Sequence, residues 1–292
     1  MSEDPFSAHR RLLFTVAYEM LGSAADAEDV VQETWLRWAA VGEEAQAAVR
    51  DPRAYLVRIV TRQSLNRLRS QVRRREEYVG PWLPEPLLTS PDVAEDVELA
   101  ESVSIAMLTV LETLGPLERA VFVLREVFDT PYDEIAEAVA RTPSAVRQIA
   151  HRAREHVAAR RPRVQVSRLE QQAVVERFLD AVRSGDLEAL LQVLAPDVVV
   201  VADGGGVVAA APRPVVGAHR VAAFLSGLAK NVGAFEATPM WLNGGPAMRI
   251  DLDTSLDTVA SLLVEDGRIT RIYAVRNPAK LGGTDVETTL SR

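Results

Sequence analysis

Residues 130–157, TPYDEIAEAVARTPSAVRQIAHRAREHV, predict two short helices joined by a tight turn. Thr142 is a suitable N-cap residue, and Pro143 fits the first helical position, where its missing N–H costs nothing. Apolar residues recur at helical spacing in the second helix, so one side of it is expected to face a core. These residues are Val146, Ile149, Ala150, Ala153 and Val157. The pattern is typical of a helix-turn-helix.

The other side of the second helix is polar and cationic. In a helix-turn-helix, early residues of this helix contact base edges and flanking cations contact phosphates. A helical hairpin with a solvated basic face would show the same pattern. The residues expected to contact DNA are Ser144, Arg147, Gln148, His151, Arg152 and Arg154.

A second basic helix lies upstream. Residues 50–75 hold nine arginines, no lysine and Asp51 as the single acid, in a chain whose formal charge is −8. Asp51 and Pro52 form a plausible start for this helix. Nucleic acid is the natural partner of such a stripe, whose net charge is near +8. We expect its cations to be free to contact a polyanion: Arg58, Arg62, Arg69 and Arg73.

The helix before it, within GSAADAEDVVQETWLRWAA (residues 22–40), has the opposite character. Ser23 and Asp26 resemble the start of a capping box. Acidic side chains lie on an exposed face, and bulky apolar groups occupy other positions. We expect one of Trp35 and Trp38 to be buried in a helical bundle.

Together these segments resemble a bacterial sigma factor of the extracytoplasmic-function (ECF) class, over about residues 6–160. DAEDVVQETWLRW is similar to the sigma-two helix that docks on the β′ clamp helices of RNA polymerase. DPRAYLVRIVTRQSLNRLRS is similar to the element that melts and reads the promoter minus-ten region. LGPLERAVFVLREVFDTPYDEIAEAVARTPSAVRQIAHRARE is similar to the sigma-four domain, which reads the minus-thirty-five element and pairs with the β flap. Glycine is more usual in this family where Ala140 and Arg141 stand.

The resemblance assigns roles to individual residues. The residues implied in polymerase contact are Asp26, Asp29, Gln32, Glu33 and Leu36. Those implied at the minus-ten region are Asp51, Arg53, Tyr55, Arg62, Asn66 and Arg67. The six residues of the recognition helix would contact the minus-thirty-five element, with Ser144 and Arg154 on phosphate.

Two composition breaks divide the chain. YVGPWLPEPLLTSPD (residues 78–92) contains four prolines and predicts an extended, semi-rigid linker. It is either a mere spacer or docks on another domain through Trp82 and Leu83, which are costly to leave in water. Arginine density falls after residues 160–166. We therefore expect a sigma-two domain over 1–76, a linker over 77–100, a sigma-four domain over 101–163, a third domain over 168–282 and a tail over 283–292.

The last part of the chain has an α+β pattern. We expect helices at 169–182 and 187–195, the second ended by Pro196, and another at 217–228. Strands are expected near 198–201, 248–252, 261–264 and 269–275, in a curved antiparallel sheet with a hairpin at Asp266-Gly267. The fold class is thus multidomain, with two all-α domains followed by one α+β domain.

Residues 168–281 resemble the SnoaL-like branch of the nuclear-transport-factor-two-like superfamily, a cone-shaped fold with an interior pocket. With WLPEP and NPAKL, this points to the ECF subgroup numbered forty-one, which carries such a domain in place of a separate anti-sigma partner. Lysine usually follows DGGG in that subgroup, whereas Val207 follows here. The resemblance implies regulation in cis through Trp82, Leu83, Asp203, Gly204, Gly205, Gly206, Asn277 and Pro278.

Superfamily relatives include isomerases and cyclases with a pocket Asp or His as general base, for which Asp203, His219 and Asp251 are candidates here. The DGGG composition also fits a plain tight turn, and His219 a plain surface position. We expect no enzymatic activity, although the pocket could hold a small molecule. Two other functions remain open: a helix-turn-helix regulator independent of polymerase, and an enzyme or sensor domain fused to a DNA-binding module.

Composition excludes several other classes. Without cysteine there are no disulfides or thiolate metal sites, and no histidine pair has metal-ligand spacing. No metal or cofactor is expected. No signal peptide or membrane-length apolar run is visible, so we expect a cytoplasmic protein without membrane contact, whose partners are core polymerase, promoter DNA and its own C-terminal domain.

Overall fold

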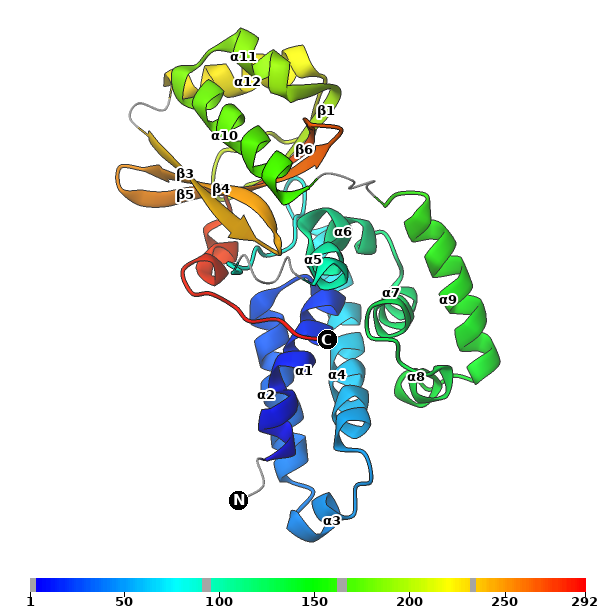
Figure 1. The fold of residues 1–292 in the computed structure, drawn as a ribbon. Helices are drawn as coiled ribbons and strands as arrows, with labels where there is room; N and C mark the ends of the chain where they lie inside the picture. Colours follow the sequence, from blue (N-terminus) through cyan, green and yellow to red (C-terminus); the bar gives the residue numbers. More distant parts are fainter. Residues whose placement is uncertain (1–3, 91–95, 162–166, 232–234) are drawn as a thin grey trace.

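A computed structural model of the chain describes residues 4–90, 96–161, 167–231 and 235–292 (Figure 1). Its first helical module contains α1 (Pro5–Leu21), α2 (Ala24–Ala39), α3 (Glu43–Ala47) and α4 (Pro52–Glu76). Gly22 ends α1 in a left-handed conformation, and the Ser23 hydroxyl then accepts a hydrogen bond from the backbone N–H of Asp26 at the start of α2. Helices α1, α2 and α4 therefore pack side by side.

The second helical module contains α5 (Val97–Val103), α6 (Ile105–Leu111), α7 (Pro116–Phe122), the π-helical turn η2 (Val123–Val127), α8 (Tyr132–Val139) and α9 (Pro143–Ala158). The predicted helix-turn-helix is confirmed as α8 and α9. Thr142 caps α9 by accepting a hydrogen bond from the Ala145 N–H at 3.3 Å. Ala140 adopts φ 53° where the family usually has glycine, so the turn keeps its left-handed residue at a cost of about 1–2 kcal/mol.

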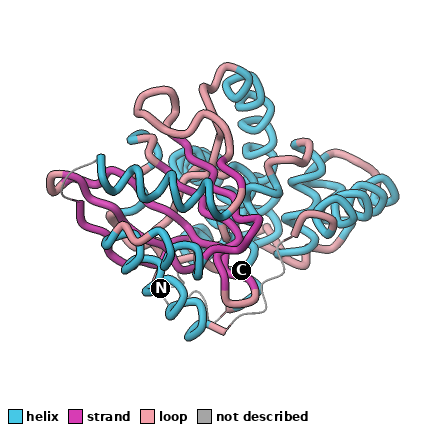
Figure 2. The backbone as a smooth tube through the Cα atoms, turned by 90° about the horizontal axis from the view of Figure 1, so that it is seen from above, coloured by secondary structure: helices cyan, strands magenta, loops and turns pink. Residues whose placement is uncertain are grey.

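The third module combines helices with one six-stranded sheet. Its helices are α10 (Arg168–Ser184), α11 (Leu187–Val193) and α12 (Ala218–Asn231). Its strands are β1 (Leu194–Asp203), β2 (Val215–Val216), β3 (Phe235–Leu242), β4 (Gly245–Leu252), β5 (Ser255–Glu265) and β6 (Arg268–Val275), in the order β2-β1-β6-β5-β4-β3. Figure 2 shows helices lying across the strands of this sheet.

Two predictions for this module are wrong in detail. The sheet is mixed rather than antiparallel, because β6 returns beside β1 and runs parallel to it, after a long crossover through α12 and the β3–β5 meander. Helix α11 ends at Val193, not at Pro196, since β1 already begins at Leu194. The predicted hairpin at Asp266-Gly267 is confirmed, with positive φ at both residues.

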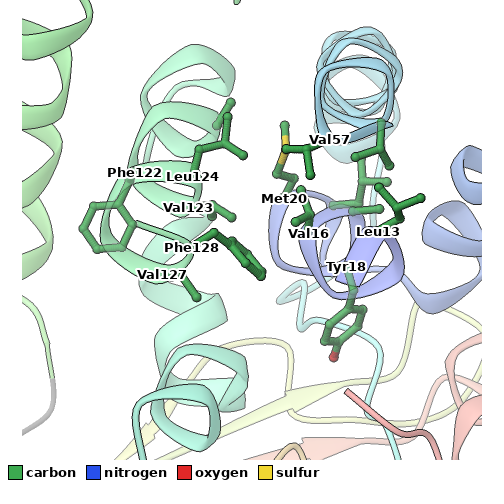
Figure 3. Packing of buried hydrophobic residues seen from close by; sticks show 14 of the residues in the cluster. Leu13, Val16, Tyr18, Met20, Val57, Phe122, Val123, Leu124, Val127 and Phe128 are labelled. Atoms are coloured by element: carbon green, nitrogen blue, oxygen red, sulfur yellow. The ribbon is translucent and has the colours of Figure 1, made fainter. Parts of the chain in front are cut away.

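The two helical modules share a single hydrophobic core. Figure 3 shows Val16 and Met20 of α1 facing residues around η2, among them Val123, Leu124 and Phe128. The third module has a core of its own between its helices and the sheet. A smaller cluster joins it to the rest, because Leu83, Ile105 and Leu281 pack together with sheet residues such as Leu242 and Tyr273. All three modules are therefore in contact.

The C-terminal segment after β6 forms two 3₁₀ turns, η3 (Pro278–Lys280) and η4 (Gly282–Thr284), and then crosses the first helical module. Leu290 is buried in the shared helical core, and the Ser291 N–H donates to the Thr15 hydroxyl at 3.1 Å. The end of the chain is thus packed against its beginning. The predicted domain boundary at residue 163 and residues 91–95 of the predicted linker lie outside the described residues.

Candidate functional site

The outward face of α9 carries the predicted recognition residues. Thr142 and Pro143 start the helix, and its apolar positions are all buried against α7 and α8. The six predicted residues therefore lie exposed on one helix: Ser144, Arg147, Gln148, His151, Arg152 and Arg154. The Arg147 guanidinium lies 5.5 Å from the Tyr132 ring centroid, so a cation–π contact with this ring stabilises the position of the Arg147 side chain.

Two of these six side chains lie beside acidic side chains of the protein. Arg154 makes a two-pronged ion pair with Glu126, at 3.1 and 2.8 Å, and His151 lies 3.6 Å from Glu155 one turn along α9. Hydrogen bonding and the charge of Glu126 raise the pKa of Arg154. Arg154 can contact a phosphate only by sharing or leaving Glu126.

Two of the four cations of α4 that were predicted to be free, Arg58 and Arg62, have partners in the structure. Arg58 pairs with Glu137 of α8 at 2.8 Å, and Arg62 donates to the backbone carbonyl oxygens of Glu137 and Ala138. The prediction failed because these partners lie more than seventy residues away and approach only when the modules pack together. Arg69 is exposed, and the Arg73 side chain lies outside the described residues.

Other predicted minus-ten residues lie along the same helix. Asp51 caps α4 by accepting from the Ala54 N–H at 2.9 Å, and Tyr55 packs its ring 5.7 Å from that of Trp38. Arg53 and Asn66 are exposed. The remaining residue of this group, Arg67, lies further along α4 and contacts α2 rather than α8.

Arg67 joins two groups of residues that the sequence assigned to different partners. Its guanidinium donates to Asp26 at 2.7 Å and to Asp29 at 2.5 Å, both on α2. Gln71 of α4 also donates to Asp26. Asp26 is therefore mostly occupied inside the module, whereas Asp29 remains half exposed.

The exposed face of α2 is both apolar and acidic. Trp38 is buried, as predicted for one of the two tryptophans, while Trp35 is 47% and Leu36 59% exposed. Gln32 and Glu33 are exposed beside them. Large exposed apolar groups next to polar ones mark a protein interaction surface. We call Gln32, Glu33, Trp35 and Leu36 the α2 face.

The linker lies between all three modules, so of the two alternatives that the sequence left open the structure shows docking. Leu83 is completely buried and Trp82 half buried. Further along, the Glu85 carboxylate accepts hydrogen bonds from the Ser23 hydroxyl at 2.8 Å and from the Ala24 N–H at 2.7 Å. Glu85 of the linker therefore caps the N-terminus of α2, where the helix dipole favours an anion.

Asp203 at the end of β1 is the centre of the contact with the linker. Its buried carboxylate accepts from the Leu83 N–H at 2.9 Å, from the Tyr78 hydroxyl and from the Lys280 ammonium at 2.7 Å. Lys280 also donates to the Leu83 carbonyl oxygen at 2.7 Å, and its Nζ lies 3.3 Å from the Trp82 ring centroid. We call Tyr78, Trp82, Leu83, Asp203, Asn277 and Lys280 the linker clasp.

The linker clasp contains four of the eight predicted regulatory residues, namely Trp82, Leu83, Asp203 and Asn277. Asn277 donates to the Tyr78 hydroxyl at 2.8 Å. Gly205 and Gly206 have positive φ, and a Cβ would collide with the Asn277 side chain at Gly205 and with Val79 of the linker at Gly206. A Cβ on Gly204 would collide with the loop itself, at Val208 and Ala210. Pro278 is exposed at the start of the η3 turn, two residues before Lys280.

Three residues of this junction were not predicted: Tyr78, Lys280 and Asn243. Tyr78 opens the predicted linker segment and Lys280 lies within NPAKL, but nothing in their spacing shows that they meet. Asn243, in the β3–β4 turn, donates to the Tyr18 hydroxyl at 2.7 Å and to the Val103 carbonyl at 2.8 Å, and accepts from the Leu87 N–H. A single buried amide thus connects both helical modules and the linker to the sheet.

A second buried polar group joins the two helical modules. Arg119 of α7 pairs with Glu112 at 2.6 Å and donates through Nε to the backbone carbonyl of Glu19 in α1 at 3.0 Å. Burial raises the pKa of Glu19 to about 8 despite a hydrogen bond with Ser102. Ser102 Oγ lies 2.8 Å from Glu19 Oε1 and 3.0 Å from the Leu99 carbonyl oxygen. Its one proton can satisfy both contacts only if Glu19 is protonated and donates.

This arrangement predicts a pH-dependent stability. In the unfolded chain Glu19 has an ordinary pKa near 4.3, so between about pH 4.5 and 8 the folded state binds the extra proton. The stabilisation that the raised pKa of Glu19 provides is fully present below about pH 4.5 and is lost as the pH rises through 8. The comparison is between the free energies of unfolding of the wild type and of Glu19→Gln. We expect this difference to fall by up to about 1 kcal/mol for each unit by which the pH rises between 4.5 and 8. Urea titrations at several pH values measure this difference, and a constant difference would contradict the assignment.

The third module encloses an apolar cavity of about 350 Å³ between its sheet and helices. None of the three candidate general bases lines it. Asp203 is engaged in the linker clasp, His219 is exposed near the start of α12, and Asp251 pairs with Arg249 at 2.8 Å. The structure therefore does not assemble these three residues into a catalytic site.

Residues 4–90, 96–161, 167–231 and 235–292 contain no cluster of three or more acidic or histidine side chains that could bind a metal ion. Among the helices so described, none combines the length and apolar composition needed to cross a membrane.

Comparison with known proteins agrees with this arrangement. Residues 6–74 match the family Sigma-70 region 2, residues 104–157 match Sigma-70 region 4, and residues 175–272 match the SnoaL-like domain. The chain is 35% identical to the ECF RNA polymerase sigma factor SigJ of Mycobacterium tuberculosis, over 98% of this chain and 95% of that protein. It is 36% identical to a probable ECF sigma factor, SigI, of the same species, over 95% of each. The crystal structure of SigJ superposes with a TM-score of 0.78 at 33% identity, covering 97% of this chain and 99% of that one.

Proposed function

Because this chain belongs to the ECF RNA polymerase sigma factors, which direct core polymerase to promoters, we propose how its surfaces divide that work. The α2 face binds the β′ clamp helices, assisted by Asp29 and, once released from Arg67, Asp26. The α4 face opens and reads the minus-ten element through the residues from Asp51 to Arg67. The α9 face reads the minus-thirty-five element, while its module binds the β flap.

The observation that carries this proposal is the presence of three such surfaces in one chain: two cationic helices and one acidic, apolar helix. Arginines bind phosphates without reading sequence, and exposed polar groups on a recognition helix read base edges. The exposed Trp35 and Leu36 are unexplained by DNA binding alone, which favours a polymerase subunit over a regulator that acts without polymerase.

The described arrangement is, in our proposal, a closed resting state. Arg62 of the minus-ten surface bonds to Ala138, only four residues before the cap of the recognition helix. The two promoter elements are centred about 25 base pairs apart, roughly 80 Å along B-form DNA. No single position of α4 against α8 can span that distance, so promoter binding requires the helical modules to separate.

The third module regulates this separation in cis. Its linker clasp holds the segment that connects the helical modules, and the C-terminal tail packs into their shared core. Separation must therefore strain or release these contacts.

The α2 face provides the test of polymerase binding. Leu36→Asp introduces a charge where an apolar contact with polymerase is proposed, and should weaken the affinity for core RNA polymerase by about 2 kcal/mol or more. The fold should tolerate the change, since Leu36 is exposed. Fluorescence anisotropy with labelled chain and core polymerase measures it. Val286→Asp, an equally apolar exposed position in the C-terminal segment, is the matched control; equal affinities of the two variants would contradict the proposal.

The α9 face predicts a change in sequence preference. Arg147→Ala should lower run-off transcription and relax preference at one minus-thirty-five position, at a cost of about 1–3 kcal/mol. Arg160→Ala, in the exposed segment after α9, should weaken binding evenly across sequences. A panel of promoters with single substitutions measures both effects. If the two variants gave the same sequence profile, the proposed base readout would be wrong.

A further inference from the structure

The cavity of the third module has the size and lining of a small-molecule site. It lies between the sheet and helices α10 and α12, and its volume of about 350 Å³ falls within the usual range for ligand pockets. Apolar side chains form nearly all of its wall, among them Val200, Phe224, Leu225, Met248 and Ile272. Such a wall favours a ligand that gains by leaving water.

The few polar side chains in the wall satisfy one another. They are Asp257, Thr258 and Arg276. The Arg276 guanidinium donates to both Asp257 oxygens, at 3.0 and 2.7 Å, and to the Ala209 carbonyl oxygen. A charged ligand would have to break this pair, so the site selects an uncharged one.

The same pair argues against turnover in the cavity. Partial burial favours the neutral form of Asp257, but hydrogen bonds from Arg276 and Thr258 outweigh it and lower the pKa of Asp257. A carboxylate held ionised by an arginine is a poor general base near neutral pH. The cavity is therefore suited to binding rather than to acid–base chemistry.

The cavity and the linker clasp are built on the same two strand ends. On β1, Ala202 lines the cavity while its neighbour Asp203 holds the linker. After β6, Arg276 lines the cavity while Asn277 bonds to Tyr78, and both of their N–H groups donate to the Asp203 carbonyl oxygen, at 2.8 and 3.0 Å. A displacement of Arg276 is thus transmitted directly to the clasp.

The loop after β1 makes a second connection. Residues 209–211 line the cavity, and Arg276 holds the Ala209 carbonyl. The start of the same loop, Gly205 and Gly206, lies in close contact with Tyr78 and Val79 of the linker. A ligand that moves one end of this short loop changes the fit of the other.

From these contacts we propose that the cavity binds an uncharged, largely apolar small molecule, and that its occupancy is coupled to the docking of the linker. The regulatory consequence rests on the proposed function, because the clasp matters only if the linker controls separation of the helical modules. Coupling is reciprocal: if the ligand alters the clasp, a change in the clasp alters the affinity for the ligand by the same factor.

The full chain can be titrated with N-phenyl-1-naphthylamine, an uncharged fluorophore that brightens in apolar sites. We expect saturable binding at one site. Ala260→Phe, which fills the cavity from β5, should weaken binding at least tenfold. Leu228 lies at a partly exposed position of the cavity wall, so Leu228→Arg should also weaken probe binding without disturbing the core. This variant replaces Ala260→Phe if the latter does not fold. Unchanged binding by a folded cavity variant would overturn the site.

A separate variant tests the coupling between the cavity and the linker clasp. Tyr78→Phe removes the hydroxyl that contacts Asp203 and Asn277 but leaves the cavity wall intact, and should change the probe affinity about fivefold or more. Tyr132→Phe, the same change in α8, should leave it unaltered. If Tyr78→Phe binds the probe like the wild type, the coupling is wrong. Run-off transcription without the probe tests the sigma function separately, so a chain that transcribes but does not bind the probe refutes this inference alone.

Discussion

Lys280→Met is expected to release the linker from the third module. The Lys280 ammonium is 4% exposed and offsets the fully buried Asp203 carboxylate at 2.7 Å. Removing one partner of a buried ion pair costs about 3–5 kcal/mol, because the remaining charge is left without compensation. The cation–π contact with Trp82 is lost as well. Amide hydrogen exchange of residues 78–89 should therefore accelerate by about a hundredfold or more.

Arg249→Met is the matched control for this experiment. Arg249 pairs with Asp251 at 2.8 Å in the same sheet, but both groups reach solvent. Surface pairs of this kind contribute about 0–1 kcal/mol. Exchange in the linker should stay at the wild-type rate in this variant. Wild-type protection of the linker in Lys280→Met would show that the clasp does not depend on the buried charge pair.

Arg119→Met is expected to destabilise the contact between the two helical modules by about 3–5 kcal/mol. Arg119 is completely buried, yet it carries the charge that compensates Glu112 and it bonds to the Glu19 carbonyl. Burial lowers the pKa of Arg119 to about 9, so the group remains charged at neutral pH. The urea midpoint of helical circular dichroism should fall, and small-angle scattering should report a larger radius of gyration.

The same substitution at Arg10 separates the effect of burial from that of charge. Arg10 also bridges two helices, pairing with Glu28 at 2.7 Å, but both side chains are about half exposed. Arg10→Met should change stability by no more than about 1 kcal/mol. Equal losses in the two variants would mean that Arg119 has no special role between the modules.

The sequence predicted those elements whose signals are local. Thr142, Pro143 and the apolar period define α9, and the positive φ values of the Asp266-Gly267 turn follow from residue types that tolerate them. The parallel pairing of β1 with β6 could not be predicted, because the order of strands depends on where β6 returns after five intervening elements. Local patterns do not contain that information.

The candidate sites show the same limit. Single-helix faces such as the α9 face could be read from spacing. The bonds from Arg58 and Arg62 to α8 could not be predicted from spacing, since they depend on the packing of one module against another. Lys280 stood inside a recognised motif, but its burial against Asp203 and Trp82 needs the fold of both the linker and the third module.

The position of the linker between all three modules affects how polymerase affinity is to be interpreted. If the open form is a minor species of the free chain, the apparent dissociation constant for polymerase equals the intrinsic one divided by the fraction of open molecules. Each 1.4 kcal/mol of stability in the closed form then weakens apparent binding tenfold. Variants of the clasp would accordingly bind polymerase more tightly, although none of them alters the surface that polymerase touches.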